Sequence, residues 1–411
     1  MKAIIEPGMA RGKISAPPSK SCAHRLLICA ALAAGESRID GVAMSQDILA
    51  TMDCVQALGA EIREENGSLL VKGCGGQLGA KDSLPVLSCR ESGSTLRFMV
   101  PLALCNGGGT FRGAERLMAR GVSVYEELLE SRGVTFVHEK DSLTVKGRLQ
   151  PGVYRMRGDV SSQFISGLLF ALPLLDESSV IEILPPFESK GYVDMTLEAL
   201  ETFGIRIVRE EAARFIVPGG QGYRPARIAV EGDWSQAAFF YGLNALGGQI
   251  EVTGLRADCL QGDKVCKSLM QNMTRGFLQA DLSDCPDLAP VLFAVAAGLE
   301  HGACFTGTRR LAIKESSRAA VMAAELAKFG AEISVGENTV QIAPTALHRP
   351  EEVLLGHNDH RVVMALAVLA TKWGGVIDDA QAVAKSYPDF FRDMAALGVK
   401  LRLEERGGME A

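Results

Sequence analysis

Residues 58–62 read Leu-Gly-Ala-Glu-Ile, and residues 329–333 read Phe-Gly-Ala-Glu-Ile. In both places an amphipathic segment precedes the glycine, and a short run of strand-forming residues follows it. Glycine is common just past the end of a helix because it adopts the left-handed conformation without steric penalty. The stretch therefore predicts a helix that ends at a glycine turn and leads into a strand.

The same landmark recurs along the whole chain. Its six glycines are Gly59, Gly133, Gly204, Gly276, Gly330 and Gly398, and the copy at Gly276 is the weakest. Successive glycines are 74, 71, 72, 54 and 68 residues apart. Self-similarity at a nearly fixed period is a stronger signal of fold than any single motif. We therefore predict six units, three in each half of the chain, each built as helix, strand, helix and closing hairpin.

Each repeat also contains a more apolar helix that begins with polar residues. The predicted openings are residues 19–21, 91–95, 161–163, 233–236, 284–287 and 358–361. Four arginines, Arg25, Arg97, Arg318 and Arg361, fall in the first turn or two of predicted helices. The dipole is unfavourable for cations there. One such arginine is ordinary, but four predict that these helix starts converge on bound anions.

The first opening, residues 17–25, reads Pro-Pro-Ser-Lys-Ser-Cys-Ala-His-Arg and precedes the apolar run 26–34. The prolines favour an extended segment, and Ser19 or Ser21 can cap the free N–H groups of the following helix. Lys20 and Arg25 add positive charge near the same end. We interpret this opening as a phosphate-binding helix start.

The composition limits the class of protein. A chain of 411 residues suits two domains, and 47% hydrophobic with 22% charged residues is ordinary for a globular protein. The net charge of −6 argues against nucleic acid or an anionic membrane as partner, so any anion site must be built locally. No apolar run has the ~18 residues of a membrane span, and the first residues have no signal-peptide core. Because the ten cysteines show no CxxC pair, we expect a cytoplasmic protein with reduced thiols.

Four motifs resemble those of the 5-enolpyruvylshikimate-3-phosphate synthase family, the 3-phosphoshikimate 1-carboxyvinyltransferases. They are Pro-Ser-Lys-Ser…Arg at 18–25, Ser-Ser-Gln-Phe at 161–164, Asn-Asp-His-Arg at 358–361 and Lys-Ser-Tyr-Pro-Asp-Phe at 385–390. One tetrapeptide alone is weak, whereas the full set in this order is specific. The resemblance covers essentially the whole chain.

The resemblance implies an α/β fold of two similar domains, each made of three βαβαββ repeats. Helices would lie inside and sheets outside, as in an inside-out α/β barrel, with the active site in the interdomain cleft. A turn rich in glycine and proline at 218–225 precedes the fourth unit. We expect an inserted domain at residues 19–229. The other domain would comprise residues 1–18 and 230–411 and would be completed by the N-terminal strand.

The activity implied by the resemblance is a transfer in the shikimate pathway, which leads to chorismate and the aromatic amino acids. The enolpyruvyl group of phosphoenolpyruvate would pass to the 5-hydroxyl of shikimate 3-phosphate, with release of phosphate through a tetrahedral intermediate. The resemblance implies no cofactor and no metal. The expected partners are these two small molecules, with no nucleic acid and no membrane, and we expect a monomer.

The resemblance also implies residue roles. The ligands of shikimate 3-phosphate would be Lys20, Ser21, Arg25, Ser161, Ser162, Gln163, Ser189, Tyr192, Asp287 and Lys314. The ligands of phosphoenolpyruvate would be Lys20, Gly93, Arg120, Gln163, Arg318, Arg361 and Lys385. The catalytic residues would be Asp287, Lys20 and Glu315, with Asp287 taking the hydroxyl proton and Glu315 acting at the enol carbon. The residue types suit the reaction, because adding an alcohol to an enol phosphate needs both an acid and a base.

Several positions depart from the family pattern. Residues 91–94 read Glu-Ser-Gly-Ser where the family commonly has Asn-Ala-Gly-Thr. Arg310, Ala312 and Ser317 stand where the family often has Asn, Arg and Asp. Lys314 and Glu315 between them are kept.

Three alternatives share the fold or its repeats. A UDP-N-acetylglucosamine enolpyruvyl transferase typically carries a reactive cysteine near the position of Arg120, but this chain has no cysteine between Cys105 and Cys259. An RNA 3′-phosphate cyclase would need a basic surface and an adenylated histidine. A non-catalytic anion-binding protein on the same scaffold is favoured only by the losses at Ala312 and Ser317.

The cations also lead to an electrostatic expectation. Each half offers four of them, which are Lys20, Arg25, Arg97 and Arg120 in the first half and Lys314, Arg318, Arg361 and Lys385 in the second. Without ligand these charges would repel, and screening at about 10 Å is only partial. We therefore expect an open free chain that bound anions would bring together.

Overall fold

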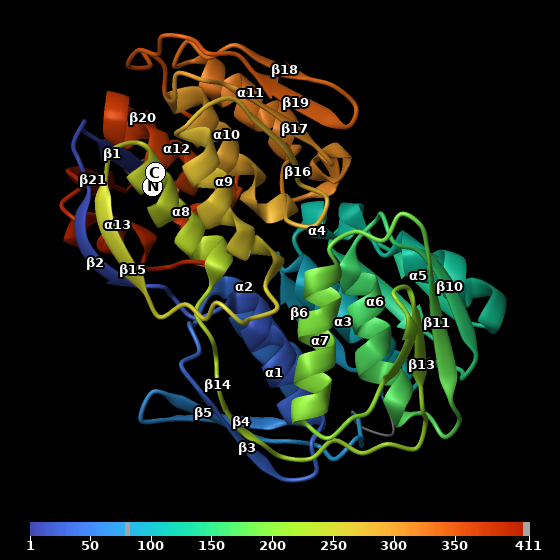
Figure 1. The fold of residues 1–411 in the computed structure, drawn as a ribbon. Helices are drawn as coiled ribbons and strands as arrows, with labels where there is room; N and C mark the ends of the chain where they lie inside the picture. The colour runs from blue at the N-terminus through green and yellow to red at the C-terminus, as the bar shows by residue number, and fades with distance from the viewer. Residues whose placement is uncertain (79–82, 406–411) are drawn as a thin grey trace, which may run out of the picture. The chain divides into compact units, whose positions relative to one another are not determined.

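A computed structural model describes residues 1–78 and 83–405 of the chain. The chain divides into two compact units, drawn in Figure 1. Unit 1 comprises Met1–Pro17 and Gly232–Ala411, and unit 2 comprises Pro18–Glu231. Among the described residues, no helix has the length and apolar character needed to cross a membrane.

Unit 2 contains three four-stranded sheets, of order β14-β3-β5-β4, β6-β7-β9-β8 and β10-β11-β13-β12. Its strands are β3 (Glu36–Asp40), β4 (Glu61–Glu65), β5 (Ser68–Lys72), β6 (Val86–Arg90), β7 (Gly108–Gly113), β8 (Thr135–His138), β9 (Ser142–Lys146), β10 (Val153–Arg157), β11 (Ser179–Leu184), β12 (Val208–Glu211), β13 (Arg214–Val217) and β14 (Arg227–Ala229). In each sheet the first two strands are parallel and the last two form an antiparallel hairpin. The first sheet takes its outer parallel strand, β14, from the end of the unit.

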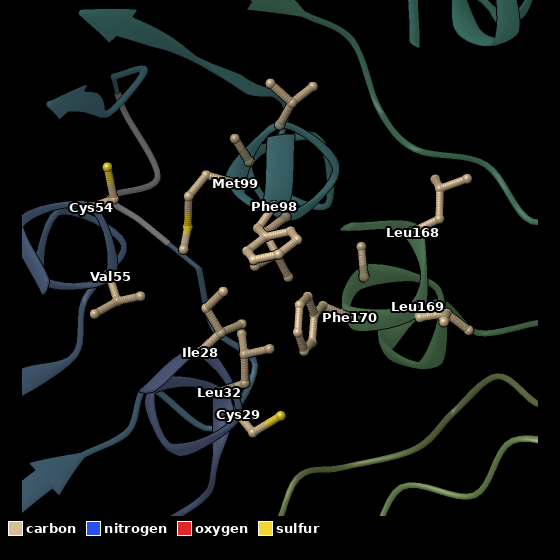
Figure 2. Close-up of a cluster of buried hydrophobic side chains, with 14 of the residues drawn as sticks. Ile28, Cys29, Leu32, Cys54, Val55, Phe98, Met99, Leu168, Leu169 and Phe170 are labelled. Carbon is tan, nitrogen blue, oxygen red and sulfur yellow. The ribbon is translucent and has the colours of Figure 1, made fainter. Parts of the chain in front are cut away.

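The helices of unit 2 lie among these sheets. They are α1 (Lys20–Leu32), α2 (Gln46–Ala57), α3 (Gly93–Leu104), α4 (Glu115–Arg120), α5 (Ser123–Leu129), α6 (Ser162–Ala171) and α7 (Lys190–Thr202), with 3-10 helices η1 (Glu130–Arg132) and η2 (Leu172–Leu174). Helices α1, α3 and α6 are buried over most of their length, which is typical of helices that pack at the centre of a core. Figure 2 shows side chains of α1, α2, α3 and α6 meeting in this core. Phe98 and Phe170 pack edge to face there, with ring centroids 5.5 Å apart.

Unit 1 contains sheets of order β16-β17-β19-β18, β20-β1-β21 and β15-β2. Its strands are β1 (Lys2–Ile5), β2 (Arg11–Ser15), β15 (Gln249–Thr253), β16 (Leu278–Asp281), β17 (Ala303–Thr306), β18 (Ile333–Val335), β19 (Thr339–Ile342), β20 (Gly375–Ile377) and β21 (Leu401–Glu404). The N-terminal strand β1 lies between β20 and β21, so the first residues complete the last sheet of the chain.

The helices of unit 1 include two that are almost wholly apolar. The set is α8 (Trp234–Ala245), α9 (Cys266–Met273), α10 (Ala289–Gly298), α11 (Arg318–Ala327), α12 (His360–Trp373) and α13 (Phe390–Ala396), with η3 (Gly262–Val265), η4 (Pro286–Leu288), η5 (Arg309–Ile313) and η6 (Ala380–Lys385). Every residue of α10 is buried, and α12 is buried except at its last two residues. Such helices need protein on all sides, so they form the centre of the unit. The α/β class predicted from the sequence is confirmed.

The prediction that every repeat closes with a hairpin is wrong for two repeats of the described chain. The sixth repeat ends in β21, which pairs with the N-terminal strand β1. The fourth repeat does not close with a hairpin, because the chain passes from α9 through Gly276 directly into β16, which pairs in parallel with β17 of the next repeat. Its sheet therefore contains only β2 and β15. This loss explains why Gly276 and Gly330 are separated by only 54 residues.

Candidate active site

Asp287 lies in η4, directly before the apolar helix α10. Its carboxylate accepts hydrogen bonds from Nη1 of Arg318 at 2.9 Å and Nη2 of Arg361 at 3.0 Å. Nζ of Lys314 lies 3.5 Å from the same carboxylate, and Nη1 of Arg361 also reaches the Asp287 carbonyl at 3.1 Å. Three cations predicted from distant parts of the sequence therefore meet at one aspartate.

Arg318, the first residue of α11, is the centre of this cluster. Its side chain is only 1% exposed, and its three nitrogens each contact a different carboxylate. Besides Asp287, it donates from Nη2 to Glu315 at 2.6 Å and from Nε to Asp359 at 2.9 Å. Burial alone would lower the pKa of Arg318, but the charges of these three carboxylates raise it, so the guanidinium stays charged.

Asp359 is the N-cap of α12, within the helix opening predicted at residues 358–361, and it has a second role. Its side chain is fully buried and accepts hydrogen bonds from the backbone N–H of Arg361, the hydroxyl of Ser316 and the guanidinium of Arg318. Burial alone would raise the pKa of Asp359, but the charge of Arg318 holds it below its usual value. One carboxylate thus fixes two helix starts, α11 and α12.

Two lysines complete the unit 1 set. Lys314 follows η5, and burial lowers its pKa against the opposing charge of Asp287. Lys385 ends η6 and donates to the Asn358 carbonyl at 2.6 Å, next to the cap residue Asp359. The predicted residues of unit 1 are therefore brought together around the starts of α10, α11 and α12.

In unit 2, the start of α1 holds Lys20 and Arg25. Lys20 forms an ion pair with Asp47 at 2.6 Å, and both side chains are mostly buried. The Arg25 guanidinium donates to the carbonyls of Ser21 at 2.7 Å and Tyr192 at 2.8 Å. Its centre also lies 5.9 Å from the centroid of the Tyr192 ring. Burial lowers the pKa of Arg25 to about 10, so the side chain is charged at neutral pH.

The start of α3 brings a second group together. Gly93 lies against the guanidinium groups of Arg97 and Arg120, since a Cβ atom there would be 3.2 Å and 3.4 Å from their terminal nitrogens. Arg97 donates to Oε1 of Gln163 at 2.7 Å, and Gln163 donates from Nε2 to Ser94 at 2.8 Å. Gly93, Arg120 and Gln163, three of the predicted site residues, thus lie together near the start of α3.

The predicted serines also lie at helix starts. Ser161 is the N-cap of α6 and accepts a hydrogen bond from the Gln163 N–H, and the buried Ser162 follows it. Ser189 immediately precedes α7 and has a left-handed backbone with φ of 56°. The arginines predicted at helix starts are all buried rather than extended into water.

Two functional candidates escaped the sequence analysis. Asp47, in the first turn of α2, pairs with Lys20, but an acidic residue at a helix start is too common to signal a site. Asp359 was recognised only as a cap, because its contact with Arg318 joins positions 41 residues apart. Among the family departures, buried Arg310 donates to the Ser283 carbonyl within unit 1.

Solved structures identify the class of fold. An EPSP synthase from Acinetobacter baumannii matches with a TM-score of 0.78 at 22% identity, covering 98% of this chain and 100% of that one. The enolpyruvyl transferase NikO from Streptomyces tendae matches with a TM-score of 0.73 at 15% identity, covering 98% of each chain. The chain therefore has the fold of the enolpyruvyl transferases.

Sequence relatives identify the family within this class. The family model for EPSP synthase (3-phosphoshikimate 1-carboxyvinyltransferase) matches residues 5–394. The 3-phosphoshikimate 1-carboxyvinyltransferase of Clostridium kluyveri is 41% identical over 421 residues, which covers 96% of each protein. That of a Clostridium perfringens strain is 39% identical over 426 residues, covering 98% of this chain and all of the relative. The chain belongs to the EPSP synthase family.

Proposed function

We propose that this chain transfers the enolpyruvyl group of phosphoenolpyruvate to the 5-hydroxyl of shikimate 3-phosphate and releases phosphate. The reaction is a step of the shikimate pathway of aromatic amino-acid biosynthesis. The observation that carries the proposal is the convergence of Asp287 and Glu315 on the buried guanidinium of Arg318. This convergence supports the proposal, because a base and an acid beside cations suit the transfer to an anionic substrate.

Unit 2 supplies most ligands of shikimate 3-phosphate in this proposal. Helix starts with free N–H groups and nearby cations favour a phosphate. The proposed ligands are Lys20, Ser21, Arg25, Ser161, Ser162, Gln163, Ser189 and Tyr192, together with Asp287 and Lys314 of unit 1. The hydrogen bonds from Arg25 to the carbonyls of Ser21 and Tyr192 support the grouping, since they tie the starts of α1 and α7 together.

Phosphoenolpyruvate carries a phosphate and a carboxylate, and the proposed ligands divide between the two groups. They are Lys20, Gly93, Arg120 and Gln163 of unit 2 and Arg318, Arg361 and Lys385 of unit 1. The bare backbone of Gly93 next to the Arg120 guanidinium supports this assignment, because an anion can then approach both.

The proposed mechanism is addition followed by elimination. Asp287 accepts the proton of the 5-hydroxyl while the hydroxyl oxygen bonds to the substituted enol carbon of phosphoenolpyruvate. Glu315 donates a proton to the methylene carbon. In the second step the carbon–oxygen bond to phosphate breaks, and the leaving phosphate takes the proton held by Asp287. Glu315 takes back one proton from the methyl group, which regenerates the enol double bond and restores both residues. Lys20 and the arginines offset the developing negative charge. Positioned acid and base groups contribute about 10²- to 10⁴-fold each.

We propose that the protein acts in the cytoplasm as a monomer. The ten cysteines are all free thiols in the structure, which suits a reducing compartment. Light scattering coupled to size exclusion would measure the mass of the purified chain, and we expect the 43.8 kDa of one copy.

Phosphate release tests the function directly. Wild-type protein is incubated with phosphoenolpyruvate and either shikimate 3-phosphate or UDP-N-acetylglucosamine as the sole acceptor. We expect phosphate only with shikimate 3-phosphate, in amounts equal to the enolpyruvyl product. Release with the nucleotide sugar alone would favour the sister activity, and binding of both substrates without release would indicate a non-catalytic protein.

The same assay tests the role of Asp287. Asp287→Ala should lower kcat by about 10²-fold or more and leave the affinity for shikimate 3-phosphate largely intact, because several other residues hold that substrate. Titration calorimetry with shikimate 3-phosphate alone measures the affinity. Unchanged turnover in the variant would remove Asp287 from the mechanism.

A further inference from the structure

The three carboxylates around Arg318 and Arg361 differ in how firmly they are held. Asp359 is 0% exposed and is also tied to Ser316 and to the α12 backbone. Asp287 and Glu315 are 22% and 26% exposed. Asp359 is therefore a fixed partner of Arg318, whereas the other two can turn toward water or toward a ligand.

We propose that Asp287 and Glu315 occupy, in the free protein, the guanidinium donors that phosphoenolpyruvate takes when it binds. The incoming anion then displaces these carboxylates from Arg318 and Arg361. This inference rests on the proposed function. It adds that the substrate itself frees Asp287 to act as the base and frees Glu315 from Arg318, so that Glu315 can take up the proton that it donates in catalysis.

The charge balance supports an exchange rather than simple addition. Lys314, Arg318 and Arg361 bring three positive charges to the cluster, and Asp287, Glu315 and Asp359 bring three negative charges. The cluster is neutral, so the phosphate and carboxylate of phosphoenolpyruvate would bring uncompensated negative charge into a partly buried place, which is unfavourable. Turning the carboxylates of Asp287 and Glu315 into solvent removes most of this excess negative charge.

Burial decides which partner moves. The side chains of Arg318 and Arg361 are 1% and 5% exposed, so neither guanidinium can follow its carboxylate into water. Asp287 and Glu315 already have part of their surface in solvent, so they lose less on release. The arginines therefore stay in place as the anion site.

The exchange couples substrate binding to the chemistry. While Asp287 accepts bonds from both arginines, its carboxylate oxygens are occupied and it is a poor acceptor for the 5-hydroxyl proton. Displacement by phosphoenolpyruvate frees an oxygen at the moment when the second substrate is in place. By linkage, anything that removes the competing carboxylate must tighten binding of the anion.

Glu315→Gln provides the test, since the amide keeps the shape of the side chain and removes its charge. We expect the Kd of phosphoenolpyruvate, measured by calorimetry without an acceptor, to fall about three- to tenfold. The KM for phosphoenolpyruvate at saturating shikimate 3-phosphate should fall in parallel, while kcat also falls. A purely catalytic role would leave the affinity unchanged, and a purely structural role would weaken it.

Glu251→Gln is the matched control. Glu251 is 64% exposed, lies in the same unit and pairs with Lys13, so its replacement makes the same change in net charge away from the site. The control should leave the affinity for phosphoenolpyruvate within about twofold of the wild type, since exposed charges are screened. Melting temperatures of both variants check the fold.

If Glu315→Gln does not fold, Asp287→Asn provides the same measurement at the other displaced carboxylate. If the folded variant binds phosphoenolpyruvate as tightly as the wild type or more weakly, the proposed exchange is overturned. That result is distinct from a failure of the proposed function, which would show as absence of phosphate release by the wild type.

Discussion

At Gly93 the methyl group of an alanine would meet side chains rather than backbone. Its nearest neighbours would be the terminal nitrogens of Arg97 and Arg120, at 3.2 and 3.4 Å. These ends can shift, so the fold should tolerate the change while the anion site becomes crowded. We therefore expect the substitution to weaken anion binding rather than to lower the stability of the fold.

Gly93→Ala should raise the KM for phosphoenolpyruvate about tenfold or more, in the range expected for a disturbed charged contact. Anionic phosphonate mimics such as glyphosate should be weakened further. Steady-state kinetics with each substrate varied in turn measures both effects. An equal loss of affinity for shikimate 3-phosphate would instead indicate damage to the fold of unit 2.

Asp263, in η3, is a buried carboxyl group whose titration affects stability. Burial, followed by the charge of Asp287, raises its pKa from 3.8 to about 6. The folded state therefore holds this proton more tightly than the unfolded chain does. The resulting stabilisation is complete below about pH 4 and is lost as the pH rises through about 6.

Asp263→Asn removes this dependence because an amide does not ionise. At pH 8 the variant should be more stable than the wild type by up to roughly 3 kcal/mol, from a shift of about two pKa units. The difference should shrink steadily as the pH falls toward 4. Urea unfolding at several pH values measures it. A constant difference across this range would show that the carboxyl group does not titrate as described.

Most of the residues that meet in unit 1 could be predicted from the sequence, but not which carboxylate contacts which cation. Glu315 and Arg318 lie three residues apart, in the turn that leads into α11 and at its first residue, so their contact is local and could be anticipated from their closeness in the sequence. The contact of Arg361 with Asp287 joins residues 74 positions apart. Only the packing of α10 beside α12 decides it, and no pattern in the sequence encodes that geometry.

At the scale of elements, α11 carries a second buried charged residue besides Arg318, and its hydrogen bonds form a clamp on the segment that precedes α12. Glu325, two turns further along, is 2% exposed and accepts hydrogen bonds from the Leu355 N–H, the His357 ring and Lys328. The segment it holds leads into His357 and Asn358, both left-handed with φ of 51° and 52°. These residues immediately precede the cap of α12.

Glu325→Ala should therefore destabilise unit 1 by about 1–3 kcal/mol, chiefly because the Leu355 N–H, His357 and Lys328 lose their shared buried acceptor. The KM for phosphoenolpyruvate should also rise, since Lys385 is anchored on the Asn358 carbonyl. Chemical denaturation and kinetics measure the two effects. Glu325→Gln is the control, because it retains an acceptor oxygen. Its loss of stability and its rise in the KM for phosphoenolpyruvate should both be smaller. Identical behaviour of the two variants would contradict the clamp.

The repeat landmark predicted elements well where the glycine turn is intact. Gly59, Gly133, Gly204 and Gly330 all have positive φ and precede the first strand of a hairpin. Gly398 also has positive φ, but β21 after it pairs with the N-terminal strand β1. Gly276 departs further, because β16 follows it and belongs to the next repeat. The residues after Gly276 are strand-forming in either case, so the sequence alone could not show which partner strand they pair with.

At the scale of the whole molecule, the electrostatic expectation counted the cations without their carboxylate partners. Three of the four unit 1 cations are paired with carboxylates, and Lys20 of unit 2 is paired with Asp47. The net positive charge of each set is therefore smaller than a count of cations gives, and the open free chain stays a prediction. The positions of the cations could be predicted from the helix starts in the sequence. Their carboxylate partners could not, because the pairs form only when the helix starts meet in the fold.

The proposed function requires that each unit contribute ligands for the two substrates. Hydrogen–deuterium exchange on the full chain tests it most directly, with shikimate 3-phosphate alone and then with glyphosate added as an unreactive anion. We predict that shikimate 3-phosphate slows exchange at residues 20–26 and 161–164 of unit 2. The added anion should extend protection to residues 286–288, 315–319 and 358–362 of unit 1. Protection confined to one unit, or located away from these helix starts, would contradict the account.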